Sequence, residues 1–225
     1  MTLDGTPEAG VYVWSWLSLA YLSMGDIAKV IECAGEVDRA SIAMGEPPAL
    51  VAHQHLCHTY VLLGTGRPAE AVEPARASLE IHRVLERQHE GFSLMLMAEA
   101  LLQSGDVAQA IDAAEQAADL LNRAMRINLE AQALGILARA ILTRDGAAGA
   151  ERAEGILDKA AALVDQSGAK SLLPSLLEWR ATVAAARGDG AERARLTRAA
   201  MALFSEMGAP AHAGRLSMSL ADTPR

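Results

Sequence analysis

The residues with the clearest chemical potential in this chain are histidines, grouped in two short segments. The first, AHQHLCHTY, contains His53, His55, Cys57 and His58, and the second contains His82, Glu86 and His89. Imidazole, thiolate and carboxylate groups are the ligands that zinc takes from proteins. The chemistry that these segments could support is therefore the binding of a transition metal.

Helical geometry restricts that interpretation. On a helix His55 and His58 share one face and His53 and Cys57 share another, so one ion cannot contact all four side chains. A mixed site would need the two segments to face each other. We therefore predict no cofactor and no metal site. If a metal ion did bind, the candidate ligands would be His55, His58, His82 and Glu86. The alternative is that His53 lines a binding groove while His82 and His89 are solvated.

Catalytic patterns are missing from the sequence. GTGRPAEA and RGDGAERAR have no preceding strand and lack the Lys-Ser/Thr pair that a phosphate-binding loop requires. Cys57 and His58 are adjacent, and neighbours on a helix diverge by about 100°. No Ser-His-Asp arrangement emerges. We therefore predict that the protein is not an enzyme.

The composition favours helices and disfavours some partners. Hydrophobic residues make up 51% of the chain and aromatic residues only 4%, with Ala and Leu common, which is typical of an all-α protein. The formal net charge of -8 opposes binding to nucleic acid or to an anionic membrane. The N-terminal segment has no basic residue, and no apolar run is long enough to span a membrane. Because two cysteines do not make a disulfide framework, we expect a cytoplasmic location and reduced thiols.

A repeated corner predicts the elements that position these residues. LLQSGDVAQAI, from Leu101 to Ile111, closely matches YLSMGDIAKVI, from Tyr21 to Ile31. Gly ends a helix with positive φ, and Asp caps the next one. Such corners recur every 39–42 residues, and a second glycine series lies half a period away. The first series is Gly25, Gly66, Gly105, Gly146 and Gly188, and the second is Gly45, Gly168 and Gly208.

The period predicts an all-α fold, a right-handed α-solenoid of about five antiparallel helix pairs with a short C-terminal helix. We expect an N-terminal lead over 1–10, a repeat domain over 11–208, and a capping helix and tail over 209–225. The pairs are expected at about 9–45, 47–90, 91–126, 127–168 and 170–208.

The pattern resembles a known repeat family. Small residues at Ser18, Thr59, Ala98, Ala138 and Ala181, the Gly-Asp corners, and the aromatic residues Trp14 and Tyr21 resemble tetratricopeptide repeats. The period exceeds the usual 34 residues. It is more similar to the repeats that follow the ATPase module in bacterial ATPase-linked adenylate or guanylate cyclases and large LuxR-type regulators. ALFSEMGAPAHAGRL is similar to their closing repeat. Because the sequence has no ATPase, cyclase or helix-turn-helix segment, it is either a fragment or a stand-alone scaffold, and no enzymatic role is carried over.

The resemblance implies a function. In tetratricopeptide arrays the first helices line a concave groove, so we expect a non-enzymatic scaffold that binds a peptide or partner helix, as the sensor or assembly region of a bacterial signalling or regulatory system. The expected groove residues are Tyr12, Leu19, His53, Leu56, Tyr60, Phe92, Met95, Glu99 and Arg139. If the register is shifted, Leu19, Leu56 and Met95 are core residues instead. Two alternatives are a small-molecule or metal sensor using the pair-two histidines, and an array that self-associates, as a homodimer, through Trp14 and Trp16 at its N-terminal end.

Overall fold

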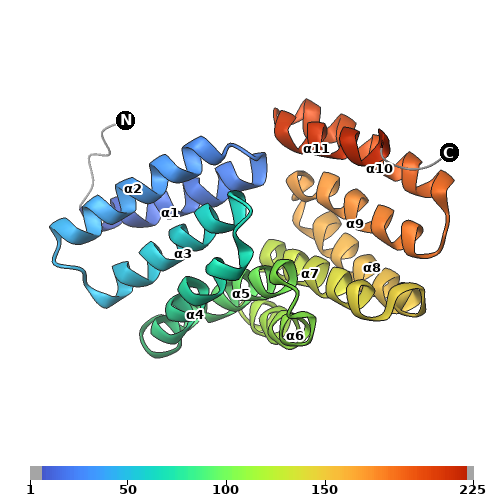
Figure 1. Ribbon diagram of the computed structural model, residues 1–225. Helices are drawn as coiled ribbons and strands as arrows, with labels where there is room; N and C mark the ends of the chain where they lie inside the picture. Colours follow the sequence, from blue (N-terminus) through green and yellow to red (C-terminus); the bar gives the residue numbers. More distant parts are fainter. Residues whose placement is uncertain (1–6, 222–225) are drawn as a thin grey trace.

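The computed structural model describes residues 7–221, which are helical apart from short connections (Figure 1). Eleven α-helices and three short 3-10 helices follow one another, and no strand occurs in this range. The helices are α1 (Pro7–Met24), α2 (Ile27–Ala43), α3 (Pro48–Gly64), α4 (Pro68–Leu85), η1 (Arg87–His89), α5 (Glu90–Ser104), α6 (Val107–Arg123), α7 (Ile127–Asp145), η2 (Gly146–Gly149), α8 (Ala150–Ser167), η3 (Lys170–Leu172), α9 (Leu173–Ala186), α10 (Gly190–Glu206) and α11 (Pro210–Ala221).

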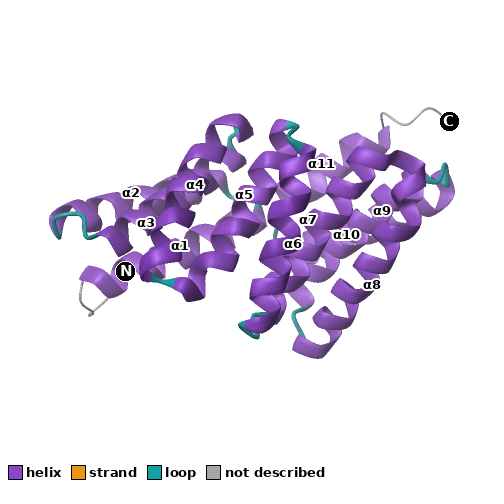
Figure 2. Cartoon of the chain, turned by 90° about the horizontal axis from the view of Figure 1, so that it is seen from below, coloured by secondary structure: helices purple, strands orange, loops and turns teal. Residues whose placement is uncertain are grey.

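Consecutive helices form five antiparallel pairs, α1–α2 to α9–α10, followed by α11 (Figures 1 and 2). The first helices of neighbouring pairs contact each other along one side of the array, which we call the inner face (Figure 1). The second helices, α2, α4, α6, α8 and α10, form the outer layer. The predicted all-α solenoid is confirmed. Within residues 7–221, no helix combines the length and apolar character needed to cross a membrane.

The corners between helices have the conformation that their sequence predicts. All eight glycines of the two series have positive φ. The side chains of Asp26, Asp106 and Asp189 each accept a hydrogen bond from the backbone N–H three residues ahead, at 2.9–3.2 Å. Each Gly-Asp corner therefore ends one helix and caps the next. After α6, at the end of the third pair, no glycine is present. Met125 has the positive φ there, at 54°.

Two local features differ from expectation. Helix α1 begins at Pro7, so residues 7–10, expected in the N-terminal lead, are helical, while residues 1–6 and 222–225 lie outside the described range. Helix α4 continues through Pro74, which the sequence predicts to kink or delay it. A proline ring removes one N–H donor from a helix, and the flanking turns are retained here.

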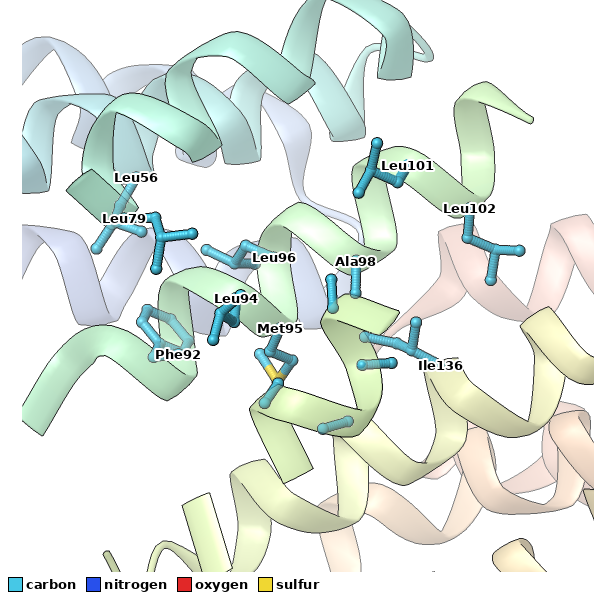
Figure 3. Close-up of a cluster of buried hydrophobic side chains, with 14 of the residues drawn as sticks. Leu56, Leu79, Phe92, Leu94, Met95, Leu96, Ala98, Leu101, Leu102 and Ile136 are labelled. Atoms are coloured by element: carbon cyan, nitrogen blue, oxygen red, sulfur yellow. The ribbon is translucent and has the colours of Figure 1, made fainter. Parts of the chain in front are cut away.

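The core is continuous along the first pairs, and many of its residues belong to α5 (Figure 3). Helix α5 contacts α3, α4, α6 and α7, so Phe92, Leu94 and Leu96 are all buried although they point in different directions. The small residues of the repeat pattern are buried: Ser18, Thr59, Ala98 and Ala138 are fully buried, and Ala181 is 5% exposed. Their short side chains allow the larger residues of neighbouring helices to fill the space between pairs.

The last helix returns to the first pair. A Cβ built at Gly25, after α1, would lie 2.9 Å from the Cβ of Ala211 in α11. The ring of His212 stacks on Phe204 of α10, with centroids 4.9 Å apart. Arg215 forms two hydrogen bonds, of 2.7 and 2.8 Å, with the carboxylate of Glu178 in α9. Helix α11 therefore joins the final pair to the initial one.

Candidate functional site

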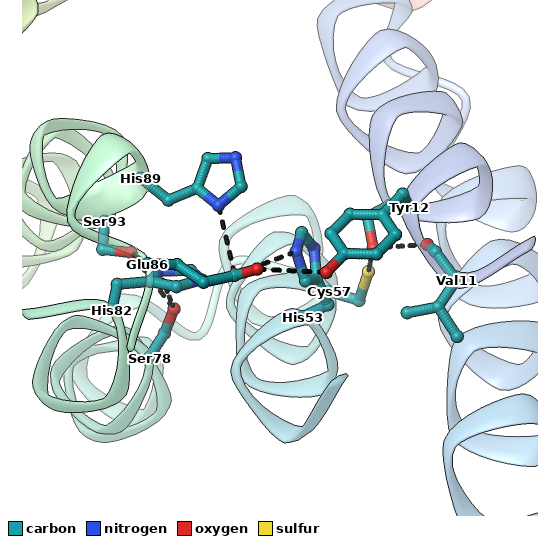
Figure 4. Close-up of polar contacts among 10 residues, drawn as sticks. Val11, Tyr12, His53, Cys57, Ser78, His82, Glu86, His89 and Ser93 are labelled. Carbon is teal, nitrogen blue, oxygen red and sulfur yellow. Dashed lines mark hydrogen bonds and ion pairs between the residues drawn. The ribbon is translucent and has the colours of Figure 1, made fainter. Parts of the chain in front are cut away.

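Five polar side chains from three helices and a connecting turn meet beside the inner face (Figure 4). We call them the histidine cluster: Tyr12 of α1, His53 of α3, His82 of α4, Glu86 immediately after α4, and His89 of η1. They meet because α4 ends at Leu85 and the chain turns through η1 before α5 begins. That turn brings Glu86 and His89 beside His53.

Glu86 lies at the centre of the histidine cluster. Tyr12 donates a hydrogen bond to its Oε1 at 3.0 Å. The other oxygen, Oε2, faces three imidazole nitrogens, at 3.2 Å from His89 Nδ1, 3.4 Å from His82 Nε2 and 3.9 Å from His53 Nε2. One carboxylate oxygen is thus held by the phenol while the other points to the three histidines.

A second group of polar atoms fixes the ring of His82. Its Nδ1 lies 2.8 Å from Ser93 Oγ and 3.3 Å from Ser78 Oγ, and the two hydroxyls lie 3.1 Å apart. Ser78, His82 and Ser93 are all fully buried. Because the two serine hydroxyls contact Nδ1 of His82, its Nε2 is directed toward Glu86.

Burial determines the charge of the cluster. His53 is 3% exposed, and burial together with the neighbouring His82 and His89 lowers its pKa to about 4. Burial and the proximity of His89 likewise lower the pKa of His82 to about 4. Burial alone raises the pKa of Glu86, but hydrogen bonds from His89 and Tyr12 outweigh it and leave that pKa lowered. At neutral pH, His53 and His82 are neutral and Glu86 is ionised.

Three nitrogens of the cluster have no hydrogen-bond partner within the described part of the chain. They are both ring nitrogens of His53 and Nε2 of His82, and all three are buried. Leaving a buried polar group unpaired costs about 1–3 kcal/mol. Glu86 satisfies the hydrogen-bonding groups of Tyr12 and His89 that face it, but it makes no hydrogen bond with these three nitrogens.

The structure separates the candidate metal ligands. His82 and Glu86 belong to the cluster, where they meet His53 and His89 rather than His55 and His58. His58 pairs with Asp38 of α2 at 3.0 Å, and His55 faces away from the cluster. The alternative in which His82 and His89 are solvated is wrong, because His82 is fully buried and the side chain of His89 is 14% exposed.

Most of the expected groove residues lie in the core. Leu56, Tyr60, Phe92 and Met95 are each less than 5% exposed. For Leu56 and Met95 this is the outcome that a shifted register predicts, whereas the burial of Tyr60 and Phe92 was not expected. Leu19 also packs against this core and is partly exposed.

The expected groove residues Glu99 and Arg139 are paired with each other. The Arg139 guanidinium on α7 lies 2.9 and 3.1 Å from the two carboxylate oxygens of Glu99 on α5. Gln103 adds a hydrogen bond of 2.7 Å to the same carboxylate. Although burial acts in the opposite direction, Arg139 holds the pKa of Glu99 below its usual value. The pair therefore joins two neighbouring first helices along the inner face.

The two tryptophans of α1 lie on different surfaces. Trp14 packs against the core, whereas Trp16 is 40% exposed and its ring lies 5.5 Å from that of Phe92 on α5. Trp16 borders a shallow depression on the inner face, of about 10 Å³, with Ser15, His53, Leu56, Tyr60, His89 and Phe92. The self-association alternative instead predicts Trp16 at the N-terminal end of the array. Its position one turn after Tyr12, an expected groove residue, would have placed it on the inner face.

The two cysteines of the chain are buried and are not activated as nucleophiles. Cys57 is buried and its Sγ lies 3.7 Å from Ser15 Oγ. Burial raises the pKa of Cys57 to about 12 and also raises the pKa of Cys33. Both side chains are thus protonated thiols at neutral pH, and the thiolate is the reactive form of cysteine.

Comparison with solved structures agrees with the repeat fold. The chain is similar to TPR-like repeats of a protein from Podosopora anserina described as a kinesin light chain, with 19% identity, a TM-score of 0.57, and coverage of 91% of this chain and 99% of that one. A variant of the same protein matches with 18% identity and a TM-score of 0.58.

A second similar structure is a Signal Transduction ATPase with Numerous Domains from Pyrococcus horikoshii, which has a tetratricopeptide repeat sensor. Its identity is 14% and its TM-score 0.58, and the alignment covers 94% of this chain but only 36% of the larger protein. No family model matches the chain, and no curated protein does. At these identities the likeness establishes the fold, a TPR-like α-solenoid.

Proposed function

We propose that this chain is a non-enzymatic protein-interaction scaffold that binds a peptide or helix of a partner protein on its inner face, around Trp16. The observation that carries the proposal is the position of Trp16. Its indole is 40% exposed while it contacts Phe92. A large aromatic side chain that packs on the protein at one face and is exposed to solvent at the other is a typical anchor for a protein partner.

The dimensions of this surface favour a protein segment over a small molecule. The depression beside Trp16 holds about 10 Å³, whereas pockets for drug-sized ligands hold about 300–1,000 Å³. A peptide can instead lie across the surface and cover Trp16 without entering a cavity. The partly exposed Glu99–Arg139 pair on α5 and α7 would offer such a segment polar contacts farther along the inner face.

The wider role that we propose is a sensor or assembly region of a bacterial signalling or transcription-regulatory system. The support is the fold shared with the repeat sensor of the Pyrococcus signalling ATPase and the resemblance of the sequence to bacterial repeat regions. We also infer a cytoplasmic location, which is supported by the two unpaired, buried cysteines.

The experiment is a selection of binding peptides from a displayed random library against the intact chain. The selected peptides are then measured against Trp16→Ala and against Ile42→Ala, a matched removal of an exposed apolar side chain on α2. We expect the Trp16 variant to lose at least about tenfold in affinity, which corresponds to about 1.4 kcal/mol. Ile42→Ala should bind as the natural chain does.

Equal binding to all three proteins would place the partner surface elsewhere. Sedimentation of the same three proteins separates a second possibility, in which Trp16 is covered by another copy of this chain. A dimer of the natural chain that is lost in Trp16→Ala would replace the peptide-binding proposal with self-association.

A further inference from the structure

We propose that His53, His82, Glu86 and His89 form a binding site for one divalent transition-metal ion, with zinc as the expected occupant. The inference does not rest on the proposed scaffold function. The four residues come from α3, from α4 and the residue after it, and from η1 (Figure 4). A bound ion would therefore fasten α3 and α4 to the turn that leads into α5.

The spacing of the ligand atoms suits one ion. One ligand atom from each of the four residues can be chosen so that all lie within 4.8 Å of one another. Zinc binds imidazole nitrogen at ~2.0–2.1 Å, so neighbouring ligand atoms of a tetrahedral site lie roughly 3.4 Å apart. The three distances from Glu86 Oε2 to the histidine nitrogens, 3.2, 3.4 and 3.9 Å, are already close to that value.

The unpaired nitrogens distinguish a metal site from a polar cluster held by hydrogen bonds alone. In the second case each buried nitrogen should make a hydrogen bond. His82 Nε2 and His53 Nε2 lie 3.4 and 3.9 Å from Glu86 Oε2, yet neither makes a hydrogen bond. A metal ion would accept the lone pairs of His82 Nε2 and one nitrogen of His53 together with the lone pair of His89. It would also make use of Oε2 of Glu86, whose other oxygen is already held by Tyr12.

The surroundings supply the outer contacts that metal sites require. A metal-bound histidine usually has its other nitrogen hydrogen-bonded, which fixes the ring and its tautomer. His82 Nδ1 has this arrangement with Ser93 and Ser78. Glu86 and His89 keep 15% and 14% of their side chains exposed, which leaves an entry route from solvent.

The ligand set selects the class of ion. Three imidazoles and one carboxylate suit zinc and similar transition metals, whereas calcium and magnesium prefer oxygen ligands throughout. Because four protein groups complete a tetrahedron, the site is a closed one, which is typical of structural zinc rather than of catalytic zinc with an open position.

The test is calorimetric titration of Zn²⁺ into the intact chain after chelator treatment, with Mg²⁺ as a parallel titrant. We expect one Zn²⁺ per chain and no comparable uptake of Mg²⁺. His82→Gln should reduce the Zn²⁺ affinity at least about 100-fold, and Ser93→Ala should reduce it by about 10-fold through the ring of His82. The control is the double variant His55→Gln/His58→Gln, which removes two histidines from the same helix pair outside the cluster and should bind Zn²⁺ unchanged.

A spectroscopic measurement on the natural chain keeps the test decisive if a cluster variant unfolds. Co²⁺ bound by the four residues should give the intense visible absorption of tetrahedral cobalt, which one equivalent of Zn²⁺ displaces. The proposal is overturned if the natural chain takes up no stoichiometric Zn²⁺, or if the cobalt spectrum is octahedral. It is equally overturned if folded His82→Gln binds Zn²⁺ as well as the natural chain, or if the His55/His58 variant loses the binding instead.

Discussion

Gly135, in the middle of α7, lies directly against the indole ring of Trp179 in α9. A Cβ at position 135 would overlap Trp179 Cζ3, and two further ring carbons would lie at 2.5 and 2.6 Å. Such distances are far below van der Waals contact, so the two helices pack at this separation only because residue 135 has no side chain. The contact joins the fourth pair to the fifth.

This contact predicts that Gly135→Ala destabilises the protein although alanine is the better helix former. Overpacking should outweigh the propensity gain and lower the free energy of unfolding by about 1–3 kcal/mol. The matched control is Gly155→Ala on α8, where nothing lies within 4 Å of the added Cβ and stability should rise by up to about 1 kcal/mol. Urea unfolding of both variants is the measurement.

A double-mutant cycle shows whether Trp179 is the cause. In a Trp179→Leu background, the added methyl group at position 135 should cost clearly less than in the natural chain, because contacting residues are non-additive. The same cost in both backgrounds would contradict the packing explanation.

The closure of the array through α11 gives a second prediction. Gly25→Ala and Gly105→Ala both place alanine at a positive φ, of 74° and 94°, so both should lose about 1–2 kcal/mol. Only the Gly25 variant forces a Cβ against Ala211, and only it should accelerate amide hydrogen exchange in α11. Hydrogen-exchange mass spectrometry of residues 210–221 is the measurement. Equal exchange in the two variants would show that the α1–α11 contact does not hold the last helix.

The Glu99–Arg139 pair gives a third prediction. Glu99→Gln leaves a mostly buried guanidinium without its carboxylate and should lower the free energy of unfolding by about 2 kcal/mol. The double variant Glu99→Leu/Arg139→Met removes both charges and should lie closer to the natural chain than Glu99→Leu or Arg139→Met alone. The natural chain, these two single variants and the double variant form a cycle that is measured by thermal and urea unfolding. Additive losses would mean that the two residues act independently.

The histidine cluster predicts a pH-dependent stability for the metal-free chain. His53 and His82 have folded-state pKa values of about 4, below the usual 6.5, so the unfolded chain binds more protons than the folded chain between those values. Stability is therefore fully present above about pH 6.5 and falls as the pH approaches 4, by roughly 3 kcal/mol for each histidine. The lowered pKa of Glu86 acts in the same direction, below its usual value of 4.5.

Urea unfolding in the presence of chelator at pH 7 and at pH 5 measures this effect. The double variant His53→Gln/His82→Gln should show a clearly smaller difference between the two pH values than the natural chain. His58→Gln, at a histidine outside the cluster, should retain the natural difference. An unchanged pH dependence in the double variant would assign the effect to other groups.

The sequence predicted those parts of the fold that depend on local chemistry. Gly25-Asp26, Gly105-Asp106 and Gly188-Asp189 define corners through backbone conformation and capping, so the pairing of helices can be read directly from them. The contact of α11 with α1 could not be predicted in this way, because it depends on the accumulated rotation of five pairs. Small angular differences at each pair decide whether the ends meet.

The candidate site was predicted only in part, for a similar reason. His82, Glu86 and His89 lie in one short segment of the sequence, which made them candidate ligands of a mixed site. Which of His53, His55 and His58 would meet it depends on the rotation of α3 against α4 and on the turn formed by η1. The rotation of a helix about its axis likewise decides whether a residue lines the groove or packs in the core. Tyr60 and Phe92, expected in the groove, are buried in the core.

The measurement that tests the central claim most directly is a two-dimensional NMR spectrum of the three tryptophan indole N–H groups, with and without a selected peptide. Individual substitutions of Trp14, Trp16 and Trp179 assign the signals. If the inner face around Trp16 is the partner surface, the Trp16 signal shifts on binding while that of Trp179, packed on Gly135, stays in place. A bound peptide that leaves the Trp16 signal unchanged and shifts that of Trp179 would contradict the account.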